Sequence, residues 1–343
     1  MNSWQMFQKI SFCDLLKQFL FTLLNSLVLR MNSSVTFGAG FSGKGFANTN
    51  DLVVGWTVVV VGERLNTVTE QTPLQLCVLQ LLFGAGTLWI LKKVNIFHNA
   101  FGFLCAARTI AEMLSSIVHL LYSGPMTITQ STAISPYFGV LVGFLGYSLA
   151  ALSCSLHVVL SLNRFLAVYF PLQYHILFTL QNCRRLIVAD VVACAVLILP
   201  YYIVPCNVVG YSAAYIGYVV LECADGVTKR PFRFGTFIHF ACWAIFCTGA
   251  IVVDGLTLLK ILKLNKIHSN GKDRMFKRNV RFFAQSAIQN IPMSAGIALL
   301  ALGNNELTAD KAVFRILSFT STRLTDVISS TAFWSLLPRV QRV

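Results

Sequence analysis

The chain has 343 residues, of which 56% are hydrophobic and only 12% are charged. A soluble domain usually spends about a quarter of its residues on charge, so this composition excludes a chain that covers itself with a water-exposed surface. The apolar residues occur in runs near the ~20 residues that a helix needs to cross a bilayer, without the alternation of β-barrel strands. We therefore predict an all-α membrane protein. The formal net charge of +14 does not indicate nucleic acid here, because of how it is distributed.

Residues 1–72 form an irregular extension before the first predicted span. An apolar stretch from Phe19 to Leu29 is too short to cross a bilayer comfortably. A glycosylation sequon begins at Asn32 and suits a location outside the cell. Met31 directly precedes the sequon, and we hypothesise that translation starts there, so that residues 1–30 are not native.

Seven transmembrane helices are predicted between residues 73 and 338, followed by a short cytoplasmic tail at 339–343. The spans lie at about 74–92, 99–123, 134–163, 186–206, 234–262, 279–303 and 312–337. With seven spans the loops alternate between two sides. One side holds fifteen basic residues and one acidic residue, whereas the other holds nine and eight. Because Lys and Arg of short loops stay in the cytoplasm, the N-terminus is predicted outside and the C-terminus inside.

Two pairs of opposite charges lie inside predicted spans. Arg108 and Glu112 are four apart on the second span, and Arg323 and Asp326 are three apart on the last, so each pair shares a helix face. Charge is costly in hydrocarbon, so these residues should face the bundle interior. We hypothesise one ionic cluster that joins the two helices and acts as a latch between two packings; alternatively, each pair neutralises itself within its own helix. Charged residues nearer helix ends are expected to snorkel to water: Asp190, Asp254 and Arg315.

The third span ends with Asn163-Arg164-Phe165, followed at a short distance by Pro171. An arginine at this end of a helix is stabilised by the helix dipole, which is one sufficient reason for its presence. The functional interpretation is a switch residue that packs against the sixth helix or contacts a partner.

Two connections between spans are long. The outer one, 207–233, includes most of the stretch from Cys206 to Cys223. The Val, Tyr and Ile residues of that stretch flank small turn-permitting residues, which predicts a β-hairpin. Of ten cysteines, these two alone lie in an outward loop between spans, where a disulfide can persist. The inner connection, 263–278, is rich in lysine. Its charge can meet anionic lipid headgroups or an acidic partner, although the positive-inside bias explains it equally well.

No enzyme, cofactor or metal site is predicted. The chain has no hydrolase elbow, phosphate loop or zinc-ligand spacing, and its six histidines lack the i, i+4 pairing of a helical metal site. His157 and His239 lie inside spans and are interpreted as hydrogen-bonded interior residues.

Four stretches, taken in order, resemble one known family. They are Phe101–Ala111 at the opening of the second helix, with Pro125 closing that helix; Asn163-Arg164-Phe165 with Pro171 and Tyr174; the Cys206–Cys223 loop; and Gln285, Ser286 and Gln289 at the start of the sixth helix. Their order and spacing are similar to those of seven-helix G protein-coupled receptors, and within them the nematode chemosensory receptors of serpentine receptor class X.

This resemblance implies a sensory receptor in the plasma membrane of a sensory cell. Such a receptor binds a small molecule from outside and activates a heterotrimeric G protein inside. The residues Asn163, Arg164 and Phe165 would form the switch on the G-protein side. Asn163 stands where the wider class more often has Asp, so the resting state is expected to be held differently. Glu112 stands where an uncharged Asn is expected.

The resemblance also implies a ligand pocket between the outer halves of helices three, five, six and seven. Its aromatic character suits a lipophilic ligand. The candidate lining residues are Tyr137, Phe138, Phe144, Tyr147, His239, Phe240, Trp243, Met293, Arg315 and Phe319.

Two other classes remain open from the sequence. Charge inside a membrane also marks ion pathways, which leaves a transporter or channel as an alternative. Against it, the chain shows neither an internal repeat nor a matching pair of Gly/Pro-interrupted helices. A non-signalling receptor remnant is the second alternative, prompted by the irregular N-terminal extension.

Overall fold

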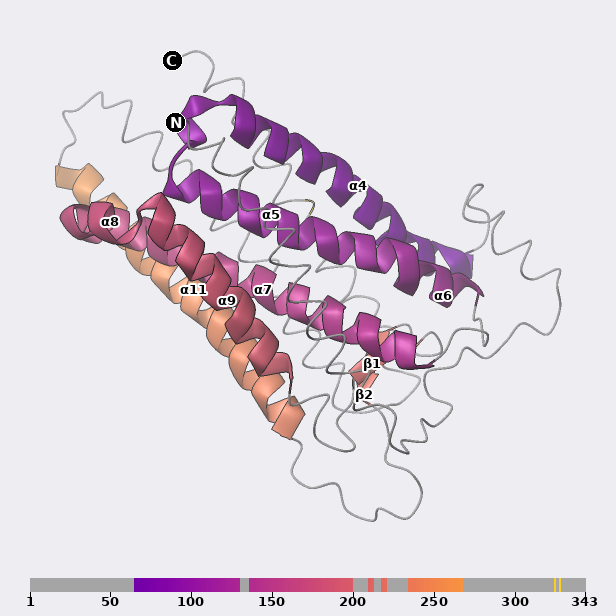
Figure 1. The fold of residues 1–343 in the computed structure, drawn as a ribbon. Helices are drawn as coiled ribbons and strands as arrows, with labels where there is room; N and C mark the ends of the chain where they lie inside the picture. The colour runs from indigo at the N-terminus through magenta and orange to yellow at the C-terminus, as the bar shows by residue number, and fades with distance from the viewer. Residues whose placement is uncertain are drawn as a thin grey trace.

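The computed structural model describes residues 65–129, 136–199, 209–212, 217–220 and 234–267, together with positions 324 and 327. These residues form a bundle of long helices and one short pair of strands (Figure 1). The helices are α4 (Leu65–Lys93), α5 (Ala100–Val118), α6 (Gly124–Thr129), α7 (Pro136–Tyr169), α8 (Pro171–Leu177), α9 (Leu180–Ile198) and α11 (Phe234–Ile267). Predictions for the N-terminal extension and for the sixth helix lie outside the described residues.

The turn from α4 into α5 is tight and depends on a glycine. A short 3-10 helix, η2 (Asn95–Phe97), reverses the chain, and the Asn99 side chain caps α5 by accepting a hydrogen bond from the Gly102 backbone N–H at 3.0 Å. A Cβ added at Gly102 would lie 2.0 Å from the Phe97 carbonyl oxygen. Only glycine permits this close approach, which fixes the position from which α5 enters the bundle.

The second helix does not end at Pro125. After α5, residues His119–Ser123 form a π-helical turn, η3, in which the Gly124 N–H bonds to the His119 carbonyl, and the chain continues as α6. Proline removes one helical N–H donor and clashes with the carbonyl four residues earlier in an α-helix. Because the π turn changes this hydrogen-bond pattern just before the proline, the helix passes through it. The prediction that Pro125 closes the helix is therefore wrong.

Helix α7 lies at the centre of the described bundle. It packs against α5, α9 and α11 and also contacts β1 (Figure 1). Its apolar residues join those of α5 and α9 in the main core, which includes Leu104, Phe144 and Leu156. This helix continues to Tyr169, six residues beyond the end of the predicted span, so Arg164 lies within a regular helix.

A β-hairpin lies in the loop between α9 and α11, as the sequence predicts. Strands β1 (Val209–Ser212) and β2 (Gly217–Val220) pair antiparallel, with Val209 opposite Val220 and Ser212 opposite Gly217. The hairpin lies near the start of α7, at the end of the bundle opposite α8 (Figure 1). We call these two ends the hairpin end and the basic end.

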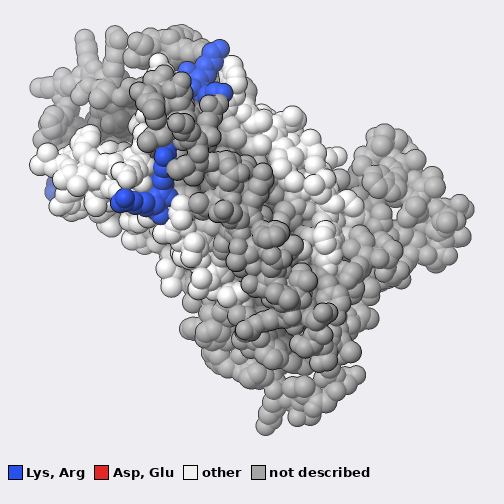
Figure 2. All heavy atoms as spheres, viewed as in Figure 1, with Lys and Arg blue, Asp and Glu red and all other residues white. Residues whose placement is uncertain are grey.

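The basic end takes its name from the lysines and arginines that gather there. On the face in Figure 2 these side chains lie toward the end of the bundle that holds α8, and no acidic side chain of the described residues is visible. The described lysines and arginines near the ends of helices include Lys92 and Lys93 at the end of α4, Arg184 and Arg185 near the start of α9, and Lys260 and Lys263 near the end of α11. Trp89 lies under the Lys93 ammonium group at 4.7 Å, an arrangement suited to a membrane interface.

Three of the described helices are long and apolar enough to cross a bilayer. They are Gln75–Lys93, the α5–α6 unit from Ala100 to Met126, and Phe138–Tyr169. Large apolar side chains such as Leu82, Leu121 and Val196 project from the bundle surface, as expected of helices that contact lipid.

Candidate functional site

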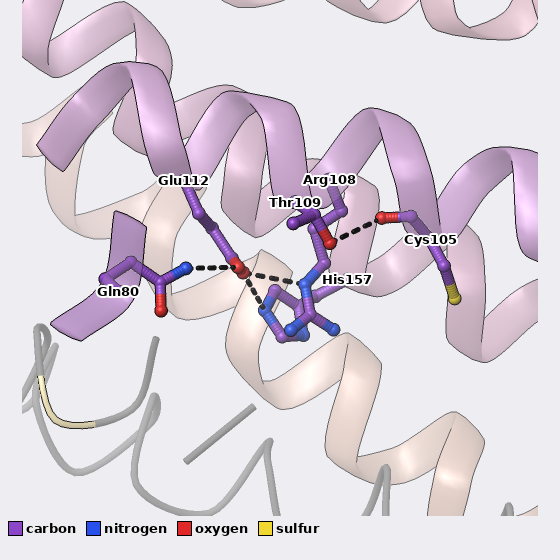
Figure 3. A network of polar contacts seen from close by, with 6 residues as sticks. All are labelled: Gln80, Cys105, Arg108, Thr109, Glu112 and His157. Carbon is purple, nitrogen blue, oxygen red and sulfur yellow. Dashed lines mark hydrogen bonds and ion pairs between the residues drawn. The ribbon is translucent and has the colours of Figure 1, made fainter. Parts of the chain in front are cut away.

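A cluster of polar side chains lies in the middle of the bundle around Glu112, whose side chain is only 2% exposed (Figure 3). Arg108 Nε donates to Glu112 Oε1 at 2.7 Å, one turn away on α5. Gln80 Nε2, on α4, donates to Glu112 Oε2 at 3.3 Å. His157 Nε2, on α7, lies 3.7 Å from Oε1. We call these four residues the Glu112 cluster.

The Glu112 cluster joins three helices through one carboxylate. A buried ion of this kind is tolerated when it is paired and its remaining lone pairs accept hydrogen bonds. Here the arginine neutralises the charge, and both carboxylate oxygens have partners. The Arg108–Glu112 pair thus forms as the spacing predicts. Glu112 also contacts α4 and α7, which neither sequence-based alternative included, while Arg323 and Asp326 lie outside the described residues.

A second ion pair lies nearer the basic end. Arg164 Nη2, on α7, donates to Asp254 Oδ1 at 3.1 Å and Oδ2 at 3.3 Å, on α11. The same nitrogen donates to Ser161 Oγ at 3.0 Å. The two charged side chains are 12% and 4% exposed, so both are largely withdrawn from water. We call this contact the Arg164–Asp254 pair.

This pair corrects one prediction and adds a contact that the sequence did not predict. Asp254 does not snorkel to water, because its carboxylate is buried and bound by an arginine. The described partner of Arg164 comes from α11, the fifth predicted helix, while the predicted contact with the sixth helix lies outside the described residues. The α11 contact was missed because the sequence separation of 90 residues gives no local spacing rule.

Asp190 is the third acid with a described side chain, and it also remains in the bundle. Ser155 Oγ, on α7, donates to Asp190 Oδ1 at 2.5 Å, and the Cys194 thiol lies 3.8 Å from the same oxygen. The acid therefore joins α9 to α7 instead of snorkelling.

The two sequence neighbours of Arg164, Asn163 and Phe165, have different surroundings. Asn163 is buried and lies near the Tyr174 side chain on α8, and burial raises the pKa of that tyrosine. The Phe165 ring stacks on Tyr169, with 4.4 Å between centroids. The Tyr169 hydroxyl then donates to the Leu256 carbonyl of α11 at 3.0 Å. The three switch candidates thus lie in three different surroundings at the basic end.

The pocket candidates on α7 differ in their surroundings. Phe144 is 1% exposed and belongs to the main core, which Tyr147 flanks, so packing accounts for both. Phe138 is 48% exposed and makes an edge-to-face contact with Tyr122, with centroids 5.3 Å apart. The other candidates have no described side chain: Tyr137, His239, Phe240, Trp243, Met293, Arg315 and Phe319. Across the described side chains, no group of three or more His, Cys, Asp or Glu is arranged to hold a metal ion.

A bundle of apolar helices whose charged side chains turn inward and pair defines a multi-pass membrane protein. The model of one family, described as serpentine type 7TM GPCR chemoreceptor Srx, matches residues 81–329, well over half of the chain. The chain belongs to this family of seven-helix chemoreceptors. No curated protein is similar enough to the chain to count as a match. The family confirms the resemblance, the all-α seven-helix fold and the multi-pass plasma-membrane location predicted from the sequence.

Proposed function

We propose that this chemoreceptor binds a small molecule from outside the cell and activates a heterotrimeric G protein inside, with its N-terminus outside. The observation that carries this proposal is the position of Arg164. It lies in the last turns of the central helix, inside the part matched by the family, at the end where the basic residues gather. A cytoplasmic partner that approaches this end would meet α7, α8 and α11 together.

Topology in intact cells tests the orientation. One epitope is placed after Ser34 and another after Val343. Staining of the first on living cells, and of the second only after permeabilisation, is the expected result. The opposite pattern would overturn the proposed orientation and favour a channel or transporter.

Arg164→Ala tests the switch. Cells that express the receptor are exposed to a panel of volatile and water-soluble compounds, and dissociation of the G-protein subunits is followed by luminescence. We expect the response of the variant to fall at least about tenfold, because the loss of a contact worth ~1.4 kcal/mol changes an equilibrium constant tenfold. Arg185→Ala, an exposed basic residue at the same end, is the control and should respond normally at equal surface expression.

We propose that the ligand enters at the hairpin end, opposite Arg164. The exposed Phe138 ring, supported by Tyr122, and the β1 strand beside α7 are consistent with an aromatic entrance. Phe138→Ala should weaken the response to an active compound, whereas Leu162→Ala, an exposed apolar change on the same helix, should not. Equal loss in both variants would contradict this location.

A disulfide between Cys206 and Cys223 is proposed for the hairpin. The four described pairs run from Val209 opposite Val220 to Ser212 opposite Gly217. In every pair the two residue numbers add up to the same value. Cys206 and Cys223 share that sum, so continuing this register by three residues would bring them opposite each other, within the reach of a disulfide. Mass spectrometry of the non-reduced protein should detect a peptide cross-linked through these cysteines. Recovery of both as free thiols would contradict the proposal.

A further inference from the structure

We propose that Asp254 is the positioning residue that holds Arg164 in the resting receptor, and that its separation from Arg164 is a step of activation. This inference rests on the proposed function and adds its regulation. The restraint lies between the third and fifth predicted helices, α7 and α11.

The first support is the form of the contact. All three described hydrogen bonds of the Arg164 side chain come from one nitrogen, Nη2, which reaches both oxygens of Asp254 and the hydroxyl of Ser161. The buried Nε has no hydrogen-bond partner within the described residues. The strongest arginine–carboxylate contacts use two nitrogens side by side. Arg164 is therefore neutralised but incompletely bonded, which favours a contact that can be released.

The second support is the identity of residue 163. With Asn at this position, Arg164 has no acidic neighbour on its own helix, and its charge is paired by a residue of α11. A carboxylate at 163 would stay within Coulomb range of Arg164 however α11 moved. Here, by contrast, moving α11 away from α7 leaves the arginine without its acid. The ion pair of Arg164 with Asp254 therefore lasts only as long as α11 packs against α7.

The third support is the weakness of the neighbouring contacts between the same helices. The Tyr169 hydroxyl donates to the Leu256 carbonyl, and the Lys260 ammonium group lies 5.3 Å from the Tyr169 ring centroid. Both contacts are nearer the solvent-facing end, where such interactions contribute little. The buried Arg164–Asp254 pair is the stronger attachment of α11 to α7 among these contacts.

The test measures activation without any ligand. G-protein subunit dissociation is recorded in cells that express the receptor with a panel of Gα subunits. Asp254→Asn should raise this basal activation by about tenfold, because a charge-assisted bond becomes a weaker neutral one. Asp254→Glu keeps the charge and should return basal activation toward that of the unchanged receptor. All variants are compared at equal surface expression.

Asp190→Asn is the matched control. It also replaces an acid bonded to α7, but this acid contacts Ser155 and has no described contact with Arg164. Basal activation should therefore stay unchanged. If Asp254→Asn does not reach the surface, Ser161→Ala replaces it, because this variant removes one contact of Nη2 and should raise basal activation about twofold.

A conformational measurement separates this inference from the proposed function. Spin labels on non-cysteine amino acids are placed at the exposed positions 167 on α7 and 263 on α11, in the full receptor in lipid nanodiscs. Asp254→Asn should broaden or lengthen the distance between the labels, whereas Asp190→Asn should not.

The outcomes distinguish the two ideas. A longer distance together with higher basal activation supports both. A longer distance with no activation by any Gα supports the restraint but contradicts the proposed G-protein function. If neither distance nor activation differs from the Asp190→Asn control, the restraint is overturned, and the Arg164→Ala experiment still tests the function by itself.

Discussion

Helix α7 contributes to two buried groups of charges that differ in how completely they are bonded. His157 belongs to the Glu112 cluster, and Arg164, seven residues or about two turns later, belongs to the Arg164–Asp254 pair. In the cluster, one carboxylate is shared by three helices, and both of its oxygens have partners. In the pair, two helices meet through one nitrogen, and the guanidinium retains an unbonded Nε within the described residues.

This difference indicates that the Glu112 cluster stabilises the bundle, whereas the Arg164–Asp254 pair can be released. A fully bonded buried charge gains from the low dielectric around it and is expensive to disturb. A partly bonded charge near the end of a helix already lacks some of that gain and can exchange its partner for water or for another protein. The interior cluster should therefore govern stability, and the pair should govern activity.

Glu112→Ala should have the largest effect on stability. It removes the acceptor for Arg108 and Gln80 and takes away the described counter-charge of a buried arginine, at a cost of about 3–5 kcal/mol. Thermal unfolding of the purified receptor and surface expression measure this loss. Adding Arg108→Ala should recover part of it, and a double variant as unstable as the sum of the singles would contradict the coupling.

His157→Phe should have the next effect, a loss of about 1–2 kcal/mol, since it removes one polar neighbour of Glu112 and leaves the arginine pair intact. The same melting experiment measures it. Ser148→Ala is a suitable control, because this buried hydroxyl has no hydrogen-bond partner among the residues described. Equal losses for the two variants would show that His157 acts only by filling space.

Asn163→Asp should change activity with little change in stability, which would separate the role of the Arg164–Asp254 pair from that of the Glu112 cluster. The new carboxylate would lie beside Arg164 on α7 itself. The increase in basal activation caused by Asp254→Asn should then fall from about tenfold to about twofold. The double variant is compared with Asp254→Asn alone, and an undiminished increase would refute the role assigned to position 163.

Tyr169→Phe should have the smallest effect. It removes the hydrogen bond to the Leu256 carbonyl but keeps the ring that stacks on Phe165. We expect a loss of about 0.5–1 kcal/mol in stability. Basal activation should rise less than in Asp254→Asn. A rise as large as in that variant would move the main restraint from the buried pair to the helix end.

Local patterns in the sequence predicted the features that depend on local spacing. Arg108 and Glu112 pair because residues four apart share a helix face, and the hairpin forms where small residues separate Val and Tyr. Gln80, His157 and Asp254 were visible only as polar residues within apolar runs. Which of them meet depends on how each helix is rotated and packed, and no spacing rule within one helix contains that information.

The π-helical turn before Pro125 has a consequence for the length of this helix. One extra residue in a helix rotates every later side chain by about 100°, and a π turn absorbs such a residue without breaking the helix. Met126, beyond the turn, is buried in a small apolar cluster with Tyr122 and Val142. Deleting one residue from His119–Ser123 would let a continuous α-helix form. In an alignment with a chain that lacks the turn, the one-residue gap therefore belongs inside the helix rather than in a loop.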